Sequence, residues 1–293
     1  METPTLSLCS RVIALLMPFL IIGCSGYQYV ASPRYVPLNE RKGDVNVYAS
    51  LTGAQLGYAF SNKFSAFATG FKRFETIFEK NQWPDGKRQR NCESREINLG
   101  LTYFGAKEKL RYEVVIGGGM GDMAFHSSYI DSSPGIEGYT LDMQADKWNV
   151  YIQPNFSYKI RERVDKHLAL AVFTKFNSVN YYNTTLTRMV TDSGTKYVEQ
   201  VVDLLPDPRY DDGLVYFSNH EKSNLFFIEP GIFVKGGAKN FKGLIQLSYV
   251  INSGGPALYY QPYSITIGAA INFNVFDWKA EIQNNKKQRL DRR

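Results

Sequence analysis

The stretch YSITIGAAINFNV, residues 263–275, decides the fold class because its side chains alternate in character with a period of two. Apolar or aromatic residues and Ala take the odd-numbered positions, and Ser, Thr, Gly, Ala and Asn take the even-numbered ones. Successive side chains of a β-strand point to opposite faces, so one face meets an apolar medium and the other a polar one. Residues 97–103 and 148–158 alternate in the same way. No stretch of comparable length repeats at 3.6 residues, and we therefore predict an all-β fold.

The same alternation predicts about ten strands, within a range of eight to twelve, between residues 44 and 275. The predicted strands are 45–51, 54–60, 64–74, 95–104, 110–121, 147–160, 167–181, 225–236, 241–251 and 263–275. Short connections alternate with long ones; the long ones are 75–94, 122–146, 182–224 and 252–262. Short turns on one rim and long loops on the other predict an antiparallel up-and-down transmembrane β-barrel.

The strands of a lipid-tethered soluble β domain would also alternate between apolar and polar residues, and this domain remains the alternative fold. Its solvent-facing positions would be rich in Lys and Glu, whereas the polar face here is mostly Asn, Ser, Thr, Gln, Gly and Ala. The apolar face carries aromatic residues near the predicted strand ends, as in the interfacial girdles of membrane proteins. They are Tyr112, Trp148, Tyr158, Tyr249, Tyr263 and Phe273. This composition favours the membrane barrel.

Two prolines, Pro154 and Pro230, fall in the middle of predicted strands. Proline has no backbone N–H, and a closed barrel has no edge strand on which the missing donor is harmless. Each proline must therefore lie at a bulge or leave a carbonyl group without its ladder partner.

The N-terminal region predicts export and lipidation. The apolar run 12–23 is shorter than the roughly 20 residues of a membrane-spanning helix, so residues 1–23 read as a secretory signal peptide. The run ends in Ile21-Ile22-Gly23-Cys24, which resembles the lipobox of bacterial lipoproteins. In that class a peptidase cuts before the cysteine, which is then acylated, and palmitate is an expected chain. The alternative is an ordinary secreted protein with Cys24 near its cleavage site by chance.

These features divide the chain into a signal peptide (1–23), a lipid-anchored N-terminal segment (24–43), the barrel (44–275) and a basic C-terminal tail (276–293). The formal net charge is +6. Residues 277–293 hold six Lys or Arg against three Asp or Glu. Because an exported lipoprotein rarely meets nucleic acid, we expect the tail to contact anionic lipid headgroups or to be solvated, and we expect no nucleic-acid partner.

Two stretches carry a family resemblance: YVASPRYVPLNERKGDVNVYAS, residues 29–50, and GAQLGYAFSNKFSAFATGF, residues 53–71. They resemble a group of uncharacterised outer-membrane β-barrel lipoproteins from Bacteroidota. The resemblance covers residues 24 to about 74 and implies location and fold, but no reaction. In that phylum acidic residues just after the lipidated cysteine tend to mark lipoproteins of the cell surface. Residues 25–29 have none, which implies a lipid anchor in the periplasmic leaflet, with both termini at the short-turn rim.

The sequence offers few residues for catalysis or metal binding. His126, His167 and His220 fall in or near predicted loops, as do several aspartates, among them Asp122, Asp131, Asp203, Asp207, Asp211 and Asp212. The aspartates lack the spacing of an EF-hand calcium loop. No nucleophile elbow, phosphate-binding loop or zinc motif occurs. We therefore expect no catalytic residues, no metal site and no cofactor.

The barrel interior and the longest loop hold the remaining candidate residues. A barrel of about ten strands is nearly filled by its own side chains, so charges that point inward must be paired. The inward charges are Arg111, Glu113, Lys175, Glu229, Lys235 and Lys242. Glu113, Lys175 and Glu229 lie deepest and are expected to form a lumen charge network.

The loop 182–224 is long enough to be functional. It is expected to project outside the cell as a partly ordered hairpin, with Tyr197, Tyr210, Tyr216 and Phe217 as candidate contacts, because exposed aromatics often anchor recognition. We therefore predict a non-catalytic outer-membrane barrel with a structural or interaction role, in contact with outer-membrane lipid and with an unidentified extracellular or cell-envelope partner. The alternative function is a narrow pore or transporter for small solutes.

Overall fold

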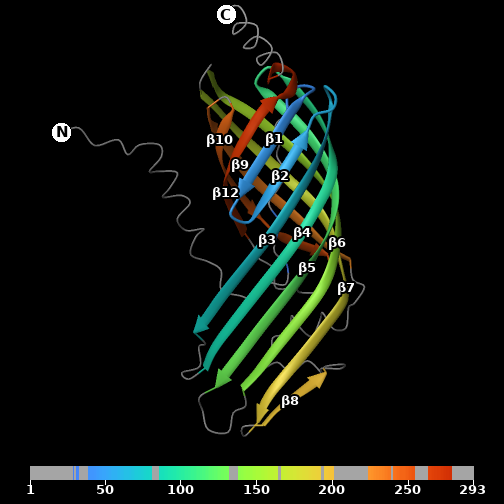
Figure 1. The fold of residues 1–293 in the computed structure, drawn as a ribbon, viewed down its shortest axis with the longest axis vertical. Coiled ribbons are helices and arrows are strands. Elements are labelled where there is room, and N and C mark those ends of the chain that lie inside the picture. Colours follow the sequence, from blue (N-terminus) through green and yellow to red (C-terminus); the bar gives the residue numbers. More distant parts are fainter. Residues whose placement is uncertain are drawn as a thin grey trace, which may run out of the picture.

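The computed structural model of the chain describes residues 29, 31–32, 39–80, 86–131, 138–163, 166–192, 195–200, 224–238, 240–254 and 263–278. These residues form twelve strands (Figure 1). The strands are β1 (Asp44–Ser50), β2 (Gly53–Tyr58), β3 (Phe64–Lys80), β4 (Gly86–Lys107), β5 (Leu110–Asp131), β6 (Gly138–Arg163), β7 (Lys166–Asp192), β8 (Thr195–Gln200), β9 (Asn224–Gly237), β10 (Phe241–Tyr249), β11 (Ile251–Gly254) and β12 (Tyr263–Asn274). A helical turn at 275–278 follows β12. Over the described ranges, no helix has the length and apolar character needed to cross a membrane.

Ten of the strands close into a barrel. The hydrogen-bonded order is β9-β10-β12-β1-β2-β3-β4-β5-β6-β7, and β7 pairs back onto β9 to complete the ring. Each neighbouring pair is antiparallel, including the β1–β12 seam between the two ends of the wall. β11 continues β10 along β9, and β8 pairs only with the far end of β7, outside the ring. The predicted antiparallel up-and-down barrel of about ten strands is confirmed.

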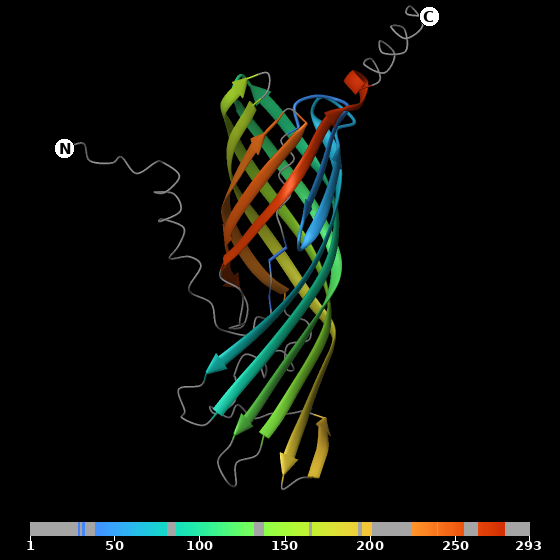
Figure 2. The same ribbon diagram turned by 60° about the vertical axis from the view of Figure 1, so that its left-hand side comes forward.

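The wall is uneven in height. β3 to β7 are 17 to 27 residues long, whereas β1 and β2 have seven and six. Figures 1 and 2 show these five strands running far beyond the other strands of the ring at the end opposite the C-terminus. The expected long loops 75–94 and 122–146 are therefore mostly strand, and that part of the prediction is wrong. The rim formed by the short turns is called the short-turn rim below, and the opposite end is called the long-strand end.

The two faces of the wall differ as the alternation predicts. Ile97 and Leu99 are 67% and 62% exposed on the outside, whereas Asn98 between them is 2% exposed. On β12, Ile267 faces outward and Thr266 inward. The outer face therefore presents an apolar band, as expected for strands that cross a membrane.

The apolar band ends in a row of charged residues toward the long-strand end. Lys72, Arg95, Asp122 and Asp146 are neighbours across β3, β4, β5 and β6. Beyond this row the outer face no longer has to be apolar, so the alternation that marks a strand in the sequence fades. This change explains why the sequence predicts loops where these strands continue.

Both prolines interrupt pairing without shifting it. The pairing of β6 with β7 skips Pro154 and resumes in the same register at Asn155. Pro230 lies where β10 gives way to β11 along β9, because that pairing stops at Ser248 and resumes at Ile251 in the same register. Of the two expected outcomes, the structure has unmade ladder rungs rather than bulges.

Aromatic rings cover glycines on the inner face. Phe67 and Tyr151 pair directly with Gly100 and Gly117. A Cβ atom at either glycine would lie 2.6 Å from the facing ring. Gly231 pairs directly with Phe173 in the same way, and the Tyr48 ring lies over Gly268 from a diagonal position, since Gly268 pairs with Ser50. Bare backbone lets the rings lie flat against a tightly curved wall.

Candidate functional site in the barrel lumen

The N-terminal segment lies inside the barrel. Tyr29, Ala31, Ser32 and Asn39 are 2%, 1%, 4% and 1% exposed, although none of them belongs to the wall. With Glu40, these residues are called the lumen segment. The sequence prediction treats residues 24–43 only as a tether and misses their place in the lumen. No periodic pattern in residues 29–40 signals it.

Tyr29 binds Glu229, which is fully buried. Its hydroxyl donates a 2.5 Å hydrogen bond to Glu229 Oε1 and accepts one of 2.8 Å from Asn177 Nδ2. The Tyr29 ring stacks on Phe227, with 3.9 Å between centroids. A buried carboxylate requires hydrogen-bond donors in place of water. Tyr29, which lies in the lumen and belongs to no strand of the wall, supplies one of them.

Ser32 contacts the second expected lumen residue, Lys175, which is 2% exposed. Lys175 Nζ donates to Ser32 Oγ at 3.4 Å and lies 4.1 Å from the centroid of the Tyr151 ring, a cation–π distance. Lys175 also stands directly opposite Glu229 in the β7–β9 register. One positive and one negative side chain therefore share this level of the lumen.

Asn39 contacts the third expected residue, Glu113, nearer the short-turn rim. Its backbone N–H donates to Glu113 Oε1 at 3.1 Å, and Asn155 Nδ2 donates to Oε2 at 3.2 Å. The Asn39 amide also donates to Ser65 Oγ at 2.9 Å and accepts from Asn46. The three expected residues thus lie in the lumen, and the lumen segment contacts each of them.

The sequence prediction misses a buried ion pair between Glu96 of β4 and Lys147 of β6. The Lys147 Nζ to Glu96 Oε2 distance is 2.8 Å, and both residues are at most 5% exposed. These strands are not adjacent; Gly121 of β5 pairs with both residues and leaves the room through which they meet. The signal is present in the sequence, because both positions share the parity of the inward-facing residues of their strands.

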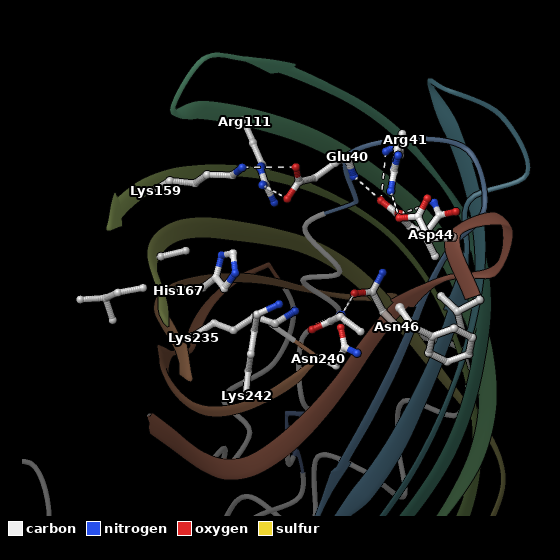
Figure 3. A pocket seen from close by; sticks show the side chains of 17 residues that line it. Glu40, Arg41, Asp44, Asn46, Arg111, Lys159, His167, Lys235, Asn240 and Lys242 are labelled. Carbon is white, nitrogen blue, oxygen red and sulfur yellow. Dashed lines mark hydrogen bonds and ion pairs between the residues drawn. The ribbon is translucent and has the colours of Figure 1, made fainter. Parts of the chain in front are cut away.

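A cavity of about 300 Å³ opens at the short-turn rim (Figure 3). The Glu40 carboxylate lies between Arg111 and Lys159, with 3.2 Å to Lys159 Nζ. Lys235 and Lys242, both expected inward, also line this cavity, as does His167. Burial would raise the pKa of Glu40, but Arg111 and Lys159 outweigh it and hold that pKa below its usual value.

Asp44 fixes the chain where it leaves this cavity. Its Oδ2 accepts the backbone N–H groups of Glu40 and Arg41 at 2.8 and 3.0 Å. Arg41 in turn pairs with Asp277, just beyond β12. The last residues of the lumen segment are therefore tied to both sides of the β1–β12 seam.

The two histidine candidates that the structure describes, His126 and His167, lie toward opposite ends of the barrel. His126 Nδ1 lies 2.5 Å from Asp142 Oδ1, but both belong to the outward-facing positions of β5 and β6, beyond the charged row. His167 lines the short-turn cavity, and His220 lies outside the described residues. Across the described ranges, no group of three or more His, Cys, Asp or Glu side chains could hold a metal ion. Asp203, Asp207, Asp211 and Asp212 are outside those ranges.

Most of the other predicted site residues lie outside the described residues as well, namely Cys24, Tyr210, Tyr216 and Phe217. Tyr197 lies on β8 and pairs with Val190 of β7. The β7–β8 hairpin extends from the long-strand end, as Figure 1 shows.

No family model and no curated protein matches the chain. Several solved structures are similar to it. A major outer membrane protein from Thermus thermophilus is 12% identical over 78% of this chain and 98% of its own, with a TM-score of 0.34. The outer membrane protease OmpT from Escherichia coli is 11% identical over 78% and 92%, with a TM-score of 0.36. CarO from Acinetobacter baumannii is 8% identical over 82% and 100%, with a TM-score of 0.32. The fold assignment rests on the strand pairing within this chain.

Proposed function

We propose that the protein is a lipid-anchored outer-membrane β-barrel that is closed by its own lumen segment and acts through its long-strand end as a structural or interaction component. The observation that carries the closed state is the contact of Tyr29, Ser32 and Asn39 with the buried charges Glu229, Lys175 and Glu113. In this proposal the segment is an internal ligand of the barrel.

The energetics favour a segment that stays in place. Removing one partner from a buried polar contact leaves the other desolvated and costs about 1–3 kcal/mol, and more when that group is charged. Withdrawal of the lumen segment would expose three such charges at once. It would also remove the aromatic stack on Phe227.

The height of the apolar band supports an outer membrane. Trp148 and Tyr158, outward-facing aromatics of β6, are 40% and 50% exposed and stand ten residues apart (158 − 148). At about 3.3 Å per residue and a tilt of about 40°, they are separated by about 25 Å along the barrel axis. Outer-membrane barrels have an apolar band of about this height, flanked by aromatic girdles. We place the short-turn rim in the periplasm and the long strands outside the cell.

We propose no catalytic role. The His126–Asp142 pair lies on the outer face of the wall, whereas the lumen cavity lies at the other rim. Long-strand aromatics such as Tyr197 remain the proposed contact residues for an extracellular or cell-envelope partner, and outer-membrane lipid surrounds the wall.

The second candidate function is a narrow pore. The short-turn cavity favours it, because five Lys or Arg side chains line that cavity against three acidic ones, Glu40, Asp44 and Asp277. If the lumen segment moved, this basic mouth would favour small anionic solutes.

Planar-bilayer conductance separates the two functions. We expect the mature wild-type protein to show no stable single-channel steps. The triple variant Tyr29→Ala, Asn39→Ala, Glu40→Ala should conduct, because the segment loses contacts at both ends of the lumen. Lys107→Ala, at the exposed last position of β4, is the control and should stay silent. Stable steps from the wild type would contradict the closed state and favour the pore.

A further inference from the structure

We infer that the N-terminal end of the mature chain, with the lipid on Cys24, lies on the same side of the membrane as the long strands β3–β7. In the proposed orientation this side is the cell surface, and the inference rests on the proposed acylation. It differs from the periplasmic leaflet that the residues after Cys24 imply.

The lumen segment runs through the barrel in one direction. Glu40, at its C-terminal end, lies in the cavity at the short-turn rim beside Arg111 and Lys159. Tyr29, at its N-terminal end, belongs to a buried apolar cluster deeper in the lumen, where its ring lies on Phe227. The described residues of the lumen segment therefore run from the long-strand half of the barrel toward the short-turn rim.

The apolar cluster around Tyr29 belongs to the long-strand half of the barrel. It includes Met123 and Met143, which lie beyond the charged row that ends the apolar band. The other members are Ala31, Phe71, Phe125, Ala145, Val179, Tyr181, Leu225, Phe227 and Val250. Tyr29 is thus held nearer the long-strand end than the short-turn rim.

Chain length limits where Cys24 can lie. Cys24 precedes Tyr29 by five residues (29 − 24), which span at most about 18 Å when fully extended. Glu229, the partner of the Tyr29 hydroxyl, is eight residues (237 − 229) from Gly237 at the short-turn end of β9. That is about 20 Å along the axis at 3.3 Å per residue and a tilt of about 40°.

The distance to the end of β9 is shorter in the opposite direction. From Glu229 to Asn224, the other end of β9, is five residues (229 − 224), or about 13 Å along the axis on the same reckoning. The Tyr29 ring stacks on Phe227, two residues closer still to Asn224. Only the long-strand side is within reach while Tyr29 keeps its contacts.

Cysteine labelling of intact cells tests the inference. In a Cys92→Ser background, three variants each add one thiol: Gly26→Cys beside the lipidation site, Ser218→Cys in the longest loop, and Lys109→Cys on a short turn. Each is treated with a membrane-impermeant maleimide, and SDS migration before boiling verifies that each barrel is folded. We expect Gly26→Cys to label as completely as Ser218→Cys, while Lys109→Cys labels only after the outer membrane is opened.

The possible outcomes separate this inference from the proposed function. Gly26→Cys that labels with Lys109→Cys, or only after unfolding, would overturn the inference. Labelling of Lys109→Cys with protection of Ser218→Cys would show that the orientation is the reverse of the proposed one. In that case Gly26→Cys would still support the inference if its labelling matched that of Ser218→Cys. A labelled thiol in the background protein, where Cys24 is the cysteine left after signal cleavage, would contradict acylation and with it the lipid part of the inference.

Discussion

Glycines on the inner face set how closely single side chains can pack against the wall. Gly117 lies under the Tyr151 ring, whereas Gly70, on the outer face of β3, has nothing within 4 Å of the place where a Cβ would be. The two strand glycines therefore differ in whether a side chain fills the space above the backbone. Lys175 also lies against the Tyr151 ring, so a shift of this ring reaches the charged part of the lumen.

We predict that Gly117→Ala lowers the free energy of unfolding by about 1–3 kcal/mol, the usual cost of overpacking a well-filled interior. Gly70→Ala should change it by less than about 0.5 kcal/mol, or raise it slightly through lower chain entropy in the unfolded state. Urea unfolding in lipid vesicles measures both. Equal effects of the two substitutions would show that the Tyr151 ring yields without cost.

At the scale of elements, the lumen segment is held by contacts of different character at its two ends. Tyr29 is fixed mainly by aromatic stacking and a buried hydrogen bond, whereas Glu40 is fixed by ion pairs at a cavity open to water. Ion pairs of a carboxylate depend on its ionisation. The Glu40 end is therefore expected to loosen once the pH falls through the lowered pKa of this carboxyl.

The pH dependence follows from the lowered pKa of Glu40. A carboxyl whose pKa is lower in the folded state adds stability above its unfolded pKa, about 4.3 for Glu, and loses it as the pH falls through the folded value. The thermal midpoint of wild type should therefore exceed that of Glu40→Gln at pH 7, and the difference should shrink as the pH falls below about 4.3 and vanish once the pH is below the folded pKa of Glu40. Thermal melts of both proteins across this range measure it. Glu108→Gln, at an exposed turn, should follow wild type throughout, and a difference for Glu40→Gln that persists in acid would show a role unrelated to charge.

At the scale of the whole molecule, closure of the ring controls resistance to denaturants. A closed barrel satisfies its backbone groups within the wall and offers no free edge at which unpairing begins. We predict that the protein runs faster on SDS gels without boiling than after boiling, because SDS at room temperature leaves the ring folded. Identical migration of both samples would favour the soluble β domain.

The sequence predicts the ring well because lipid imposes an alternation that can be read locally. Ile267 and Thr266 lie on the predicted faces, and ten strands form the wall. The prediction fails beyond Lys72 and Asp122, where the apolar band of the outer face has ended. It also fails for the lumen segment: Tyr29 and Glu229 are 200 residues apart, and neither carries a local mark of the other. Parity does place Glu113, Lys175 and Glu229 inward, but it cannot show what contacts them.

A chain that runs through its own ring constrains the order of assembly. The β1–β12 seam joins residues near both ends of the barrel sequence, so it forms only after the other strands are made. If Cys24 is acylated as proposed, that chain end is too wide to be drawn afterwards through a lumen filled with aromatic and charged side chains. The lumen segment must therefore already lie across the unfinished sheet when β1 pairs with β12, and the wall closes around it. Assembly factors that complete this barrel would act on a substrate in which the lumen segment, although it precedes every strand in the chain, is the last part to be enclosed.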